Sequence, residues 1–287
     1  MIFGTLYVRW MRDRTVSLIA WTVGILLIVI LTAAFYPSFG DATEQLVSGS
    51  DGGSSDVMST FLGLSAGIDP GSPLGFLWVG LYANIFPWML MALGVSLGIA
   101  AIAGDEETRN LEYLLSGPVD RTVVVFARFA GFVSTLFIVS FVSAIGLIIS
   151  LPVFDLTGDY TSTAADGTTV TSPGATAGDV FAGTLAAFAV ALGLGAIAFM
   201  LGAAIGRKAT ALGIATAIGV GGYVLYTLSE MTGDLEALTW VSPWRWYVDD
   251  AMLVNGLDWP VLFPFGTAII GLLVGWQVFI RRDLKGG

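Results

Sequence analysis

The sequence of 287 residues contains no cysteine and no histidine. Without cysteine the chain has neither a disulfide framework nor a thiolate metal site. Without histidine it lacks the commonest general base, metal ligand and pH switch. Charged residues make up only 12% of the chain, whereas soluble proteins have about a quarter. These absences argue against a soluble protein and against most hydrolytic and metal-dependent enzymes.

Hydrophobic residues, in contrast, make up 55% of the sequence. Six apolar segments are long enough to cross a bilayer, which takes about 20 residues. None alternates polar and apolar residues as barrel strands do. The segments are residues 16–36, 75–103, 123–151, 180–205, 209–227 and 261–280. We therefore expect an all-α integral membrane protein, with six transmembrane helices in a single domain, 1–287.

Basic residues predict the orientation of these spans, because they stay on the cytoplasmic side. Eleven of the twelve lie on one side, with seven acidic residues, and Arg245 lies alone on the other side with fifteen. Both termini are therefore predicted to be cytoplasmic. Arg128, just inside the third span, is expected to reach towards the cytoplasmic interface. Pro87 in the second span is a predicted kink site.

The outer loops differ in composition. Residues 155–178 are low in complexity, and we expect them to be flexible. The loop 229–259 is rich in aromatic residues, which concentrate at the level of the lipid head groups, so we expect it to lie on the bilayer. Its aromatic residues are Trp240, Trp244, Trp246, Tyr247 and Trp259.

No catalytic motif is apparent in the sequence. There is no G-x-x-x-x-G-K-[ST] phosphate loop, and a Ser-His-Asp triad is impossible without histidine. The carboxylate pairs Glu106/Glu107 and Asp249/Asp250 are more typical of solvated surfaces than of a catalytic site. The six predicted spans contain no Asp, Glu or Lys, whereas carriers driven by protons or sodium hold ionisable groups there. The sequence therefore predicts neither an enzyme nor an ion-driven carrier.

Small residues recur at four-residue spacing in several spans, which lets helices approach closely. The pairs are Gly94/Gly98, Gly202/Gly206, Gly213/Gly221 with Ala217 between them, and Gly271/Gly275. Each pair can serve packing within one chain or contact with a second chain.

The segment between the second and third spans predicts a short amphipathic helix on the cytoplasmic face. Asp105 is a suitable N-cap, and Glu106 and Glu107 would occupy the first turn. Gly117-Pro118 would end the helix, and Asp120 can cap the third span. Leu111, Leu114 and Leu115 form its apolar face, while Glu106, Glu107, Arg109 and Asn110 would point towards the cytosol. Such a helix can dock to a cytosolic partner or simply anchor two spans.

These motifs resemble the ABC-2 family of transporter permeases, in particular the subunits of polyketide-antibiotic and multidrug exporters. The resemblance extends over nearly the whole chain, although the long acidic loop 155–178 departs from it. The residues that carry it are Tyr7–Arg14, Phe35-Tyr36-Pro37-Ser38-Phe39, Ala103-Gly104-Asp105-Glu106-Glu107, Leu111-Glu112, Leu114-Leu115-Ser116, Pro118-Val119, Arg121, Ser242-Pro243-Trp244-Arg245-Trp246-Tyr247, Asn255-Gly256-Leu257-Asp258-Trp259 and Phe279-Ile280-Arg281-Arg282-Asp283-Leu284.

The resemblance implies roles for three segments. Residues 2–14, with Arg9, Arg12 and Arg14, look like the elbow helix on the inner leaflet. Residues 105–116 look like the coupling helix that sits in a groove of the ATPase, and residues 240–254 look like the outer re-entrant or surface helices. The residues expected to couple to the ATPase are Asp105, Glu106, Glu107, Arg109, Asn110, Leu111, Glu112, Leu114, Leu115, Pro118 and Arg121.

The resemblance further implies a permease that exports a hydrophobic or amphipathic compound. ATP and Mg²⁺ would be bound by a separate ATPase subunit and no cofactor by this chain, and two permeases would pair with two ATPases. Two alternatives stay open: a six-span carrier or channel, and a membrane assembly or immunity protein. We expect a prokaryotic plasma membrane. The excess of Asp over Glu and of Arg over Lys is typical of a salt-loving organism.

Overall fold

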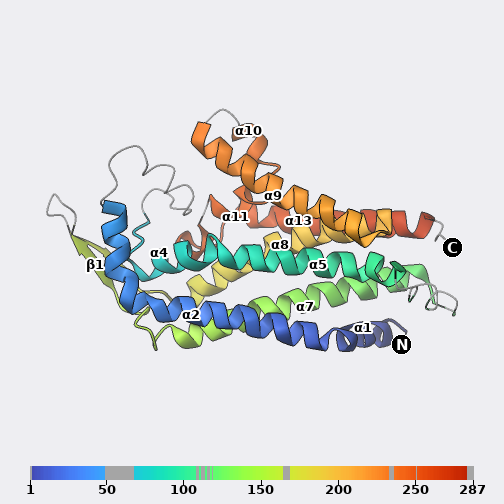
Figure 1. Ribbon diagram of the computed structural model, residues 1–287, viewed down its shortest axis with the longest axis horizontal. Helices are drawn as coiled ribbons and strands as arrows, with labels where there is room; N and C mark the ends of the chain where they lie inside the picture. The colour runs from blue at the N-terminus through green and yellow to red at the C-terminus, as the bar shows by residue number, and fades with distance from the viewer. Residues whose placement is uncertain are drawn as a thin grey trace.

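In a computed structural model, the protein forms a bundle of long helices (Figure 1). The structure describes residues 2–48, 68–107, 110, 114, 117, 119–163, 169–232, 236–249 and 251–282. Six of the helices in these ranges are long and apolar enough to cross a membrane. They cover Thr15–Ser38, Pro73–Glu107, Arg121–Ser150, Ala177–Ile205, Lys208–Glu230 and Trp259–Arg281. The predicted six-span, all-α class is confirmed.

The elements follow one another in a simple order. The long helices are α2 (Thr15–Ser48), α5 (Ile85–Glu107), α7 (Arg121–Ser150), α8 (Ala177–Ile205), α9 (Lys208–Thr232) and α13 (Leu262–Arg281). The shorter elements are α1 (Ile2–Asp13), α4 (Pro73–Leu77), the π-helical turn η1 (Trp78–Tyr82), β1 (Tyr160–Thr163), β2 (Thr169–Ser172), α10 (Glu236–Thr239), α11 (Arg245–Val248), α12 (Met252–Asn255) and the 3-10 turn η2 (Trp259–Val261).

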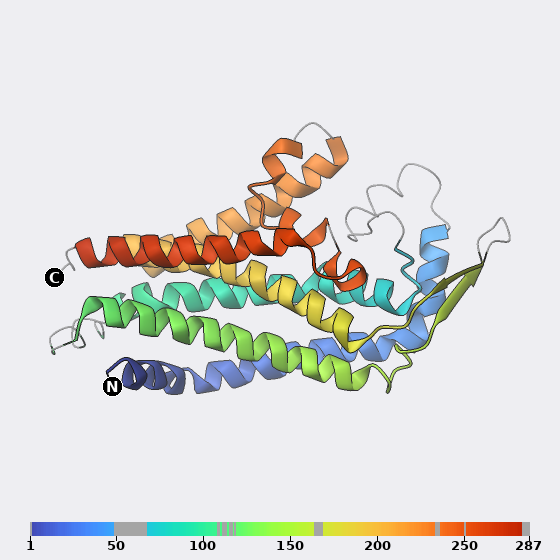
Figure 2. The same cartoon turned by 180° about the vertical axis from the view of Figure 1, so that it is seen from behind.

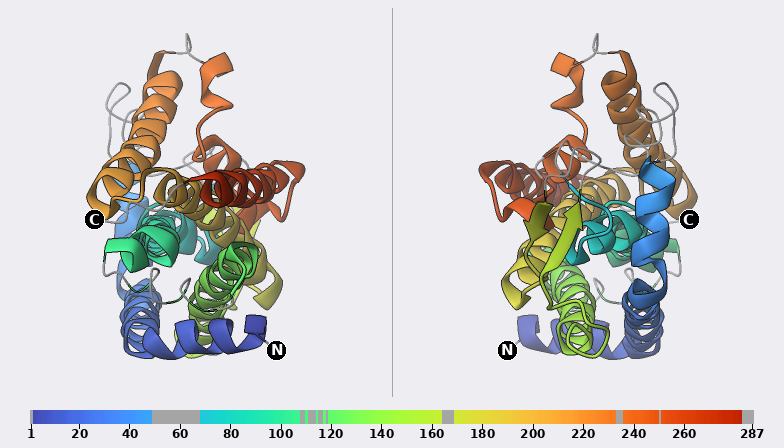
Figure 3. Two further views of the ribbon diagram at one scale, coloured as in Figure 1. Left: turned by 90° about the vertical axis from the view of Figure 1, so that its right-hand side faces the viewer. Right: turned by 90° about the vertical axis from the view of Figure 1, so that its left-hand side faces the viewer.

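The two ends of the bundle differ. The start of α1 and the end of α13 lie at the same end, and the β1–β2 hairpin lies at the other (Figures 1 and 2). We call these the basal end and the hairpin end. Viewed along the bundle, α1 runs across the basal end at a steep angle to the long helices (Figure 3). A separate helix therefore precedes the first span, as expected for the elbow segment.

Helix α8 lies at the centre of the bundle and makes its most extensive contacts with α5 and α13. Glycines allow this close packing. A Cβ atom at Gly98 would collide with the carbonyl oxygen of Gly195, and one at Gly271 would lie 2.7 Å from that of Ala196. The small-residue pairs in α5 and α13 thus serve internal packing. In contrast, Gly213 and Gly221 of α9 have no atom within 4 Å of a built Cβ.

Two segments between the predicted spans contain regular structure that the sequence did not reveal. The first span was predicted to end at residue 36, but α2 runs through Pro37 to Ser48 and bends rather than ends (Figure 1). The loop predicted to be flexible contains the antiparallel pair β1–β2, with Tyr160 opposite Ser172. Its threonines are β-branched and favour strands, which the low complexity of the segment obscured.

The second span is interrupted before Pro87 rather than at it. The π-helical turn η1 is followed by a turn at Ala83 and Asn84, and α5 begins at Ile85. Pro87 therefore falls in the first turn of α5, where proline is tolerated because its missing N–H would have no helical partner there. The Asn84 side chain donates to the carbonyl oxygen of Val79 at 3.0 Å and satisfies a backbone group of the widened turn.

The α5–α8 crossing generates a stability prediction. Gly98→Ala places a methyl group against the α8 backbone, so we expect it to lower the free energy of unfolding by about 1–3 kcal/mol. Gly24→Ala in α2 is the matched control, because nothing lies within 4 Å of its built Cβ. Thermal unfolding in detergent measures both. Equal midpoints for the two variants would contradict the close approach.

Candidate functional site

The basal end holds a network of charged side chains that begins at the end of α5. Asp105 Oδ2 lies 2.5 Å from Arg128 Nη2 of α7, and both side chains are buried, at 12% and 11% exposure. Since an ion in the low-dielectric interior needs a partner, this pair fixes α5 against α7. Arg128 is thus paired within the protein, and the prediction that it extends to the interface is wrong.

The next two carboxylates bind two further helices. Glu106 forms an ion pair with Arg282, directly after α13. Glu107 accepts a hydrogen bond from the backbone N–H of Lys208, the first residue of α9, at 2.7 Å. A carboxylate at that position satisfies a free helix N–H group and interacts favourably with the helix dipole. Three consecutive residues of α5 therefore contact α7, the end of α13 and the start of α9.

Gly206, between α8 and α9, allows this arrangement. Its φ of +66° is left-handed, a conformation that glycine adopts at little cost. A Cβ atom there would lie 2.5 Å from the Arg282 guanidinium and 2.7 Å from the Glu106 carboxylate. Glycine is thus required at position 206 for two reasons: the backbone is left-handed there, and the ion pair leaves no room for a side chain.

Helix α1 is held to the network by Trp10 and Arg14. The Trp10 ring is fully buried and packs against Gly131 of α7, where a Cβ atom would lie 2.5 Å from the ring. The Arg14 guanidinium lies 4.2 Å from the Trp10 ring centroid, a cation–π contact, and donates to the carbonyl oxygen of Ala100 at 3.1 Å. Burial lowers the pKa of Arg14 and the neighbouring Asp105 and Asp13 oppose this shift.

The residues predicted to couple to an ATPase lie at or near this network. The expected N-cap at Asp105 is wrong, because α5 continues to Glu107. Helix α5 propagates through Gly104, because a single glycine costs a helix only about 1 kcal/mol. Nor does Glu106 point freely towards the cytosol, since it pairs with Arg282. The predicted Asp120 cap is confirmed, because its Oδ1 accepts from the Thr122 N–H at 2.6 Å.

The remaining coupling residues are only partly described. Asn110 and Leu114 are helical; Asn110 is exposed, and the half-buried Leu114 packs against the cluster around Val124 and Phe279. Arg121 donates to the carbonyl oxygen of Arg282 at 2.9 Å. Arg109, Leu111, Glu112, Leu115 and Pro118 lie outside the described residues.

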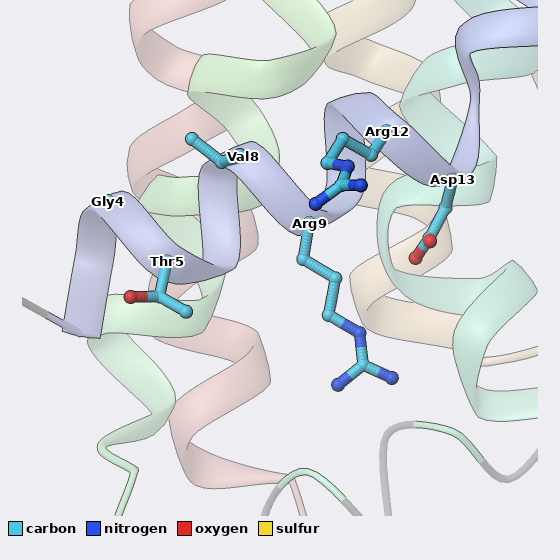
Figure 4. A pocket seen from close by; sticks show the side chains of 6 residues that line it. All are labelled: Gly4, Thr5, Val8, Arg9, Arg12 and Asp13. Atoms are coloured by element: carbon cyan, nitrogen blue, oxygen red, sulfur yellow. The ribbon is translucent and has the colours of Figure 1, made fainter.

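A hollow of about 900 Å³ opens beside α1 at the basal end. Figure 4 shows the side chains that line it, from Gly4 to Asp13 on one face of the helix. Arg9 and Arg12 are exposed there, whereas Trp10 and Arg14 are directed at α7 and α5. Helix α1 thus presents one face to the bundle and a basic face to the solvent.

The predicted outer aromatic segment divides into two groups. Trp244 and Tyr247 are fully buried in the bundle, so the prediction that they lie at the head groups is wrong. Trp244 Nε1 donates to the carbonyl oxygen of Gly219 in α9 at 3.2 Å, and the Tyr247 hydroxyl donates to that of Tyr82 at 2.6 Å. Burial raises the pKa of Tyr247 well above its ordinary value.

The second group stays at the surface. Trp240 and Trp259 are 41% and 55% exposed, and Trp246 is half-buried with Arg245 beside it. Within α11, Tyr247 is buried and Trp246 is half-buried, because successive side chains leave a helix in different directions. Sequence alone gave no means to separate the two groups.

A comparison with known protein families decides the identity. The sequence profile described as ABC-2 family transporter protein matches residues 8–248. The chain belongs to the ABC-2 transporter family. It is a multi-pass membrane protein and carries the membrane domain of an ABC transporter. A comparison with curated proteins gave no match.

Within this ABC-2 membrane domain, the sequence gave no sign of the contacts that three residues make. Trp10, Gly131 and Arg282 lie far from their partners in the chain, so only the fold brings the pairs together. The one available signal was Arg128, a charge inside a predicted span, since such a residue needs a partner.

The buried ion pair generates a prediction. Asp105→Asn leaves Arg128 buried beside a neutral group, so we expect a loss of about 3–5 kcal/mol in the free energy of unfolding. The double variant Asp105→Asn/Arg128→Gln should lose less than the sum of the single variants. Thermal unfolding in detergent tests this, with Asp155→Asn, an exposed position before β1, as control. Additive losses would contradict a direct pair.

Proposed function

We propose that this chain is the permease subunit of an ABC exporter whose ATP is bound and hydrolysed by a separate subunit. One observation carries the proposal: the chain belongs to the ABC-2 family and its sequence has no phosphate loop. The energy source must then reach the spans from outside the chain. ATP and Mg²⁺ would be held by the partner, with no cofactor bound here.

The basal end is the proposed docking surface for the ATPase. The segment between α5 and α7 begins at three carboxylates that contact three other helices. A partner that displaces this segment therefore acts on α7, α9 and α13 together. The exposed Asn110 and the basic face of α1, with Arg9 and Arg12, are accessible to a partner at this end. The basal end would then be cytoplasmic, in a prokaryotic plasma membrane.

The proposed cargo is hydrophobic or amphipathic. An apolar hollow of about 190 Å³ lies between α5 and α9, lined by residues such as Trp88, Val95 and Leu212. Thr216 is its one hydroxyl-bearing side chain. Sites with apolar walls and few polar groups suit apolar ligands, and a larger cargo would require the hollow to widen as α9 moves.

A second permease copy is proposed to cover α9. Gly213 and Gly221 are not packed against any described residue, and Leu212, Ile214 and Ile218 are about 40% exposed on the same helix. Small residues let another helix approach closely. The working unit would be two permeases with two ATPases.

The docking surface generates a prediction for the partner. Arg109→Ala and Asn110→Arg should each weaken co-purification of the ATPase by about tenfold or more, since such changes at a small polar contact typically remove over about 1.4 kcal/mol. Glu107→Ala is less informative, because it also removes the hydrogen bond to α9. Thr171→Arg in the exposed β2 strand serves as control. Unchanged co-purification of both variants would contradict docking at this segment.

The α5–α9 hollow generates a prediction for the cargo. Thr216→Phe fills the hollow from an exposed position on α9, so we expect efflux of an amphipathic dye from cells to fall several-fold while expression stays normal. Ile145→Phe, at a position of α7 that is 57% exposed, is the matched control. The proposed pathway is wrong if the two variants transport equally well.

A further inference from the structure

A group of exposed tryptophans surrounds a hollow on the hairpin half of the molecule. The hollow has a volume of about 220 Å³ and is lined by Trp240, Arg245, Trp246, Asp249, Trp259 and Pro260. The rings of Trp240 and Trp259 stack with centroids 5.8 Å apart. Trp246 Nε1 donates to the carbonyl oxygen of Trp240 at 2.9 Å, which fixes the third indole in the same wall.

A cation already lies in this cluster. The Arg245 guanidinium sits 4.5 Å from the Trp240 ring centroid, and its Nε lies 3.3 Å from Asp249 Oδ2. The guanidinium also donates to the Thr239 hydroxyl. The Trp240 ring and the Asp249 carboxylate thus both stabilise the positive charge of Arg245, which is a side chain of the protein itself.

The surroundings favour positive charge as well. Arg245 is the single basic residue between Lys208 and Arg281, a long stretch that contains six acidic residues. Tryptophan faces attract cations through the ring quadrupole, most strongly where water is partly excluded. Three indoles beside a carboxylate therefore form a site for an organic cation. At about 220 Å³ the hollow suits a trimethylammonium or guanidinium head group, since drug-sized ligands occupy about 300–1,000 Å³.

We propose that this aromatic cluster is a binding site for organic cations, in which Arg245 is the internal occupant that an incoming cation replaces. An entering cation takes the position over Trp240 and beside Asp249. The Arg245 side chain then turns to the solvent, because two cations so close together repel each other. The exposed edges of Trp240 and Trp259, at 41% and 55%, leave the site open from outside.

This inference goes beyond the proposed export function and does not depend on it. The cluster lies on residues 239–260, and its hollow shares no lining residue with the hollow beside α1 or with the α5–α9 hollow. Binding is measured on this chain alone, without an ATPase. Its failure would leave the export proposal intact, and loss of ATPase docking would leave this site intact.

The test is titration of the purified protein with choline, followed by calorimetry in a detergent without choline groups. The neutral isostere 3,3-dimethyl-1-butanol has the same shape without the charge. We expect choline to bind at least about fivefold more tightly, as a cation–π contact of roughly 1 kcal/mol requires. Equal affinities would overturn the proposal.

Variants separate the cation site from a merely structural cluster. Arg245→Gln removes the internal competitor, so we expect choline affinity to rise about three- to tenfold. Asp249→Asn and Trp259→Leu should each lower it about fivefold. Arg12→Gln, on the basic face of α1, removes a positive charge elsewhere and should have no effect. Unchanged or weaker choline binding by a folded Arg245→Gln protein would overturn the internal-occupant role.

Two further measurements establish that the variants are folded and where the bound cation comes from. Thermal unfolding first establishes that each variant is folded. If the Arg245→Gln variant is not folded, the proposal is tested by Asp249→Asn and Trp259→Leu. A choline affinity that neither of these two variants changes would overturn the site. Titration of the protein with choline in nanodiscs of either phosphatidylcholine or phosphatidylglycerol identifies the source of the cation. Weaker binding of free choline in phosphatidylcholine nanodiscs indicates that the choline head group of the lipid also reaches the site and competes.

Discussion

The close contact between α5 and α8 is the constraint on which the rest of the bundle depends. Between lipid-exposed helices the hydrophobic effect is weak, so packing has to come from dispersion and from backbones that approach closely. Gly94, Gly98 and Gly195 provide that approach. Because α8 also packs against α13 through Gly271, the second and sixth spans are held against one central helix.

The basal network adds the specific connections that apolar packing lacks. Apolar faces can slide or exchange neighbours at little cost, whereas a buried ion pair has one satisfactory geometry. Asp105 with Arg128 joins two consecutive spans, and Glu106 with Arg282 joins the second span to the end of the last. In an ABC-2 membrane domain the same end is proposed to meet the ATPase. The network would then lie between the energy source and the spans.

The six spans and their approximate limits were predictable, because lipid imposes long apolar helices and hydropathy records them. The Asp120 cap was also predictable, since capping is local. Partners such as Arg282 for Glu106 were not, because the two residues are 176 positions apart and only the fold unites them. Burial of Trp244 beside a half-buried Trp246 depends on the placement of one helical turn. That placement follows from contacts with α5 and α9, and no local pattern encodes it.

The three consecutive carboxylates of α5 restrict how this helix can move. Successive side chains leave an α-helix about 100° apart, so Asp105, Glu106 and Glu107 point in three directions and each meets a different helix. Rotation of α5 about its own axis would carry all three away from their partners at once. Tilting or axial sliding together with the neighbouring helices preserves them. A force applied after Glu107 is therefore passed on as a rocking motion of several helices, and a screw-like motion of α5 alone is blocked.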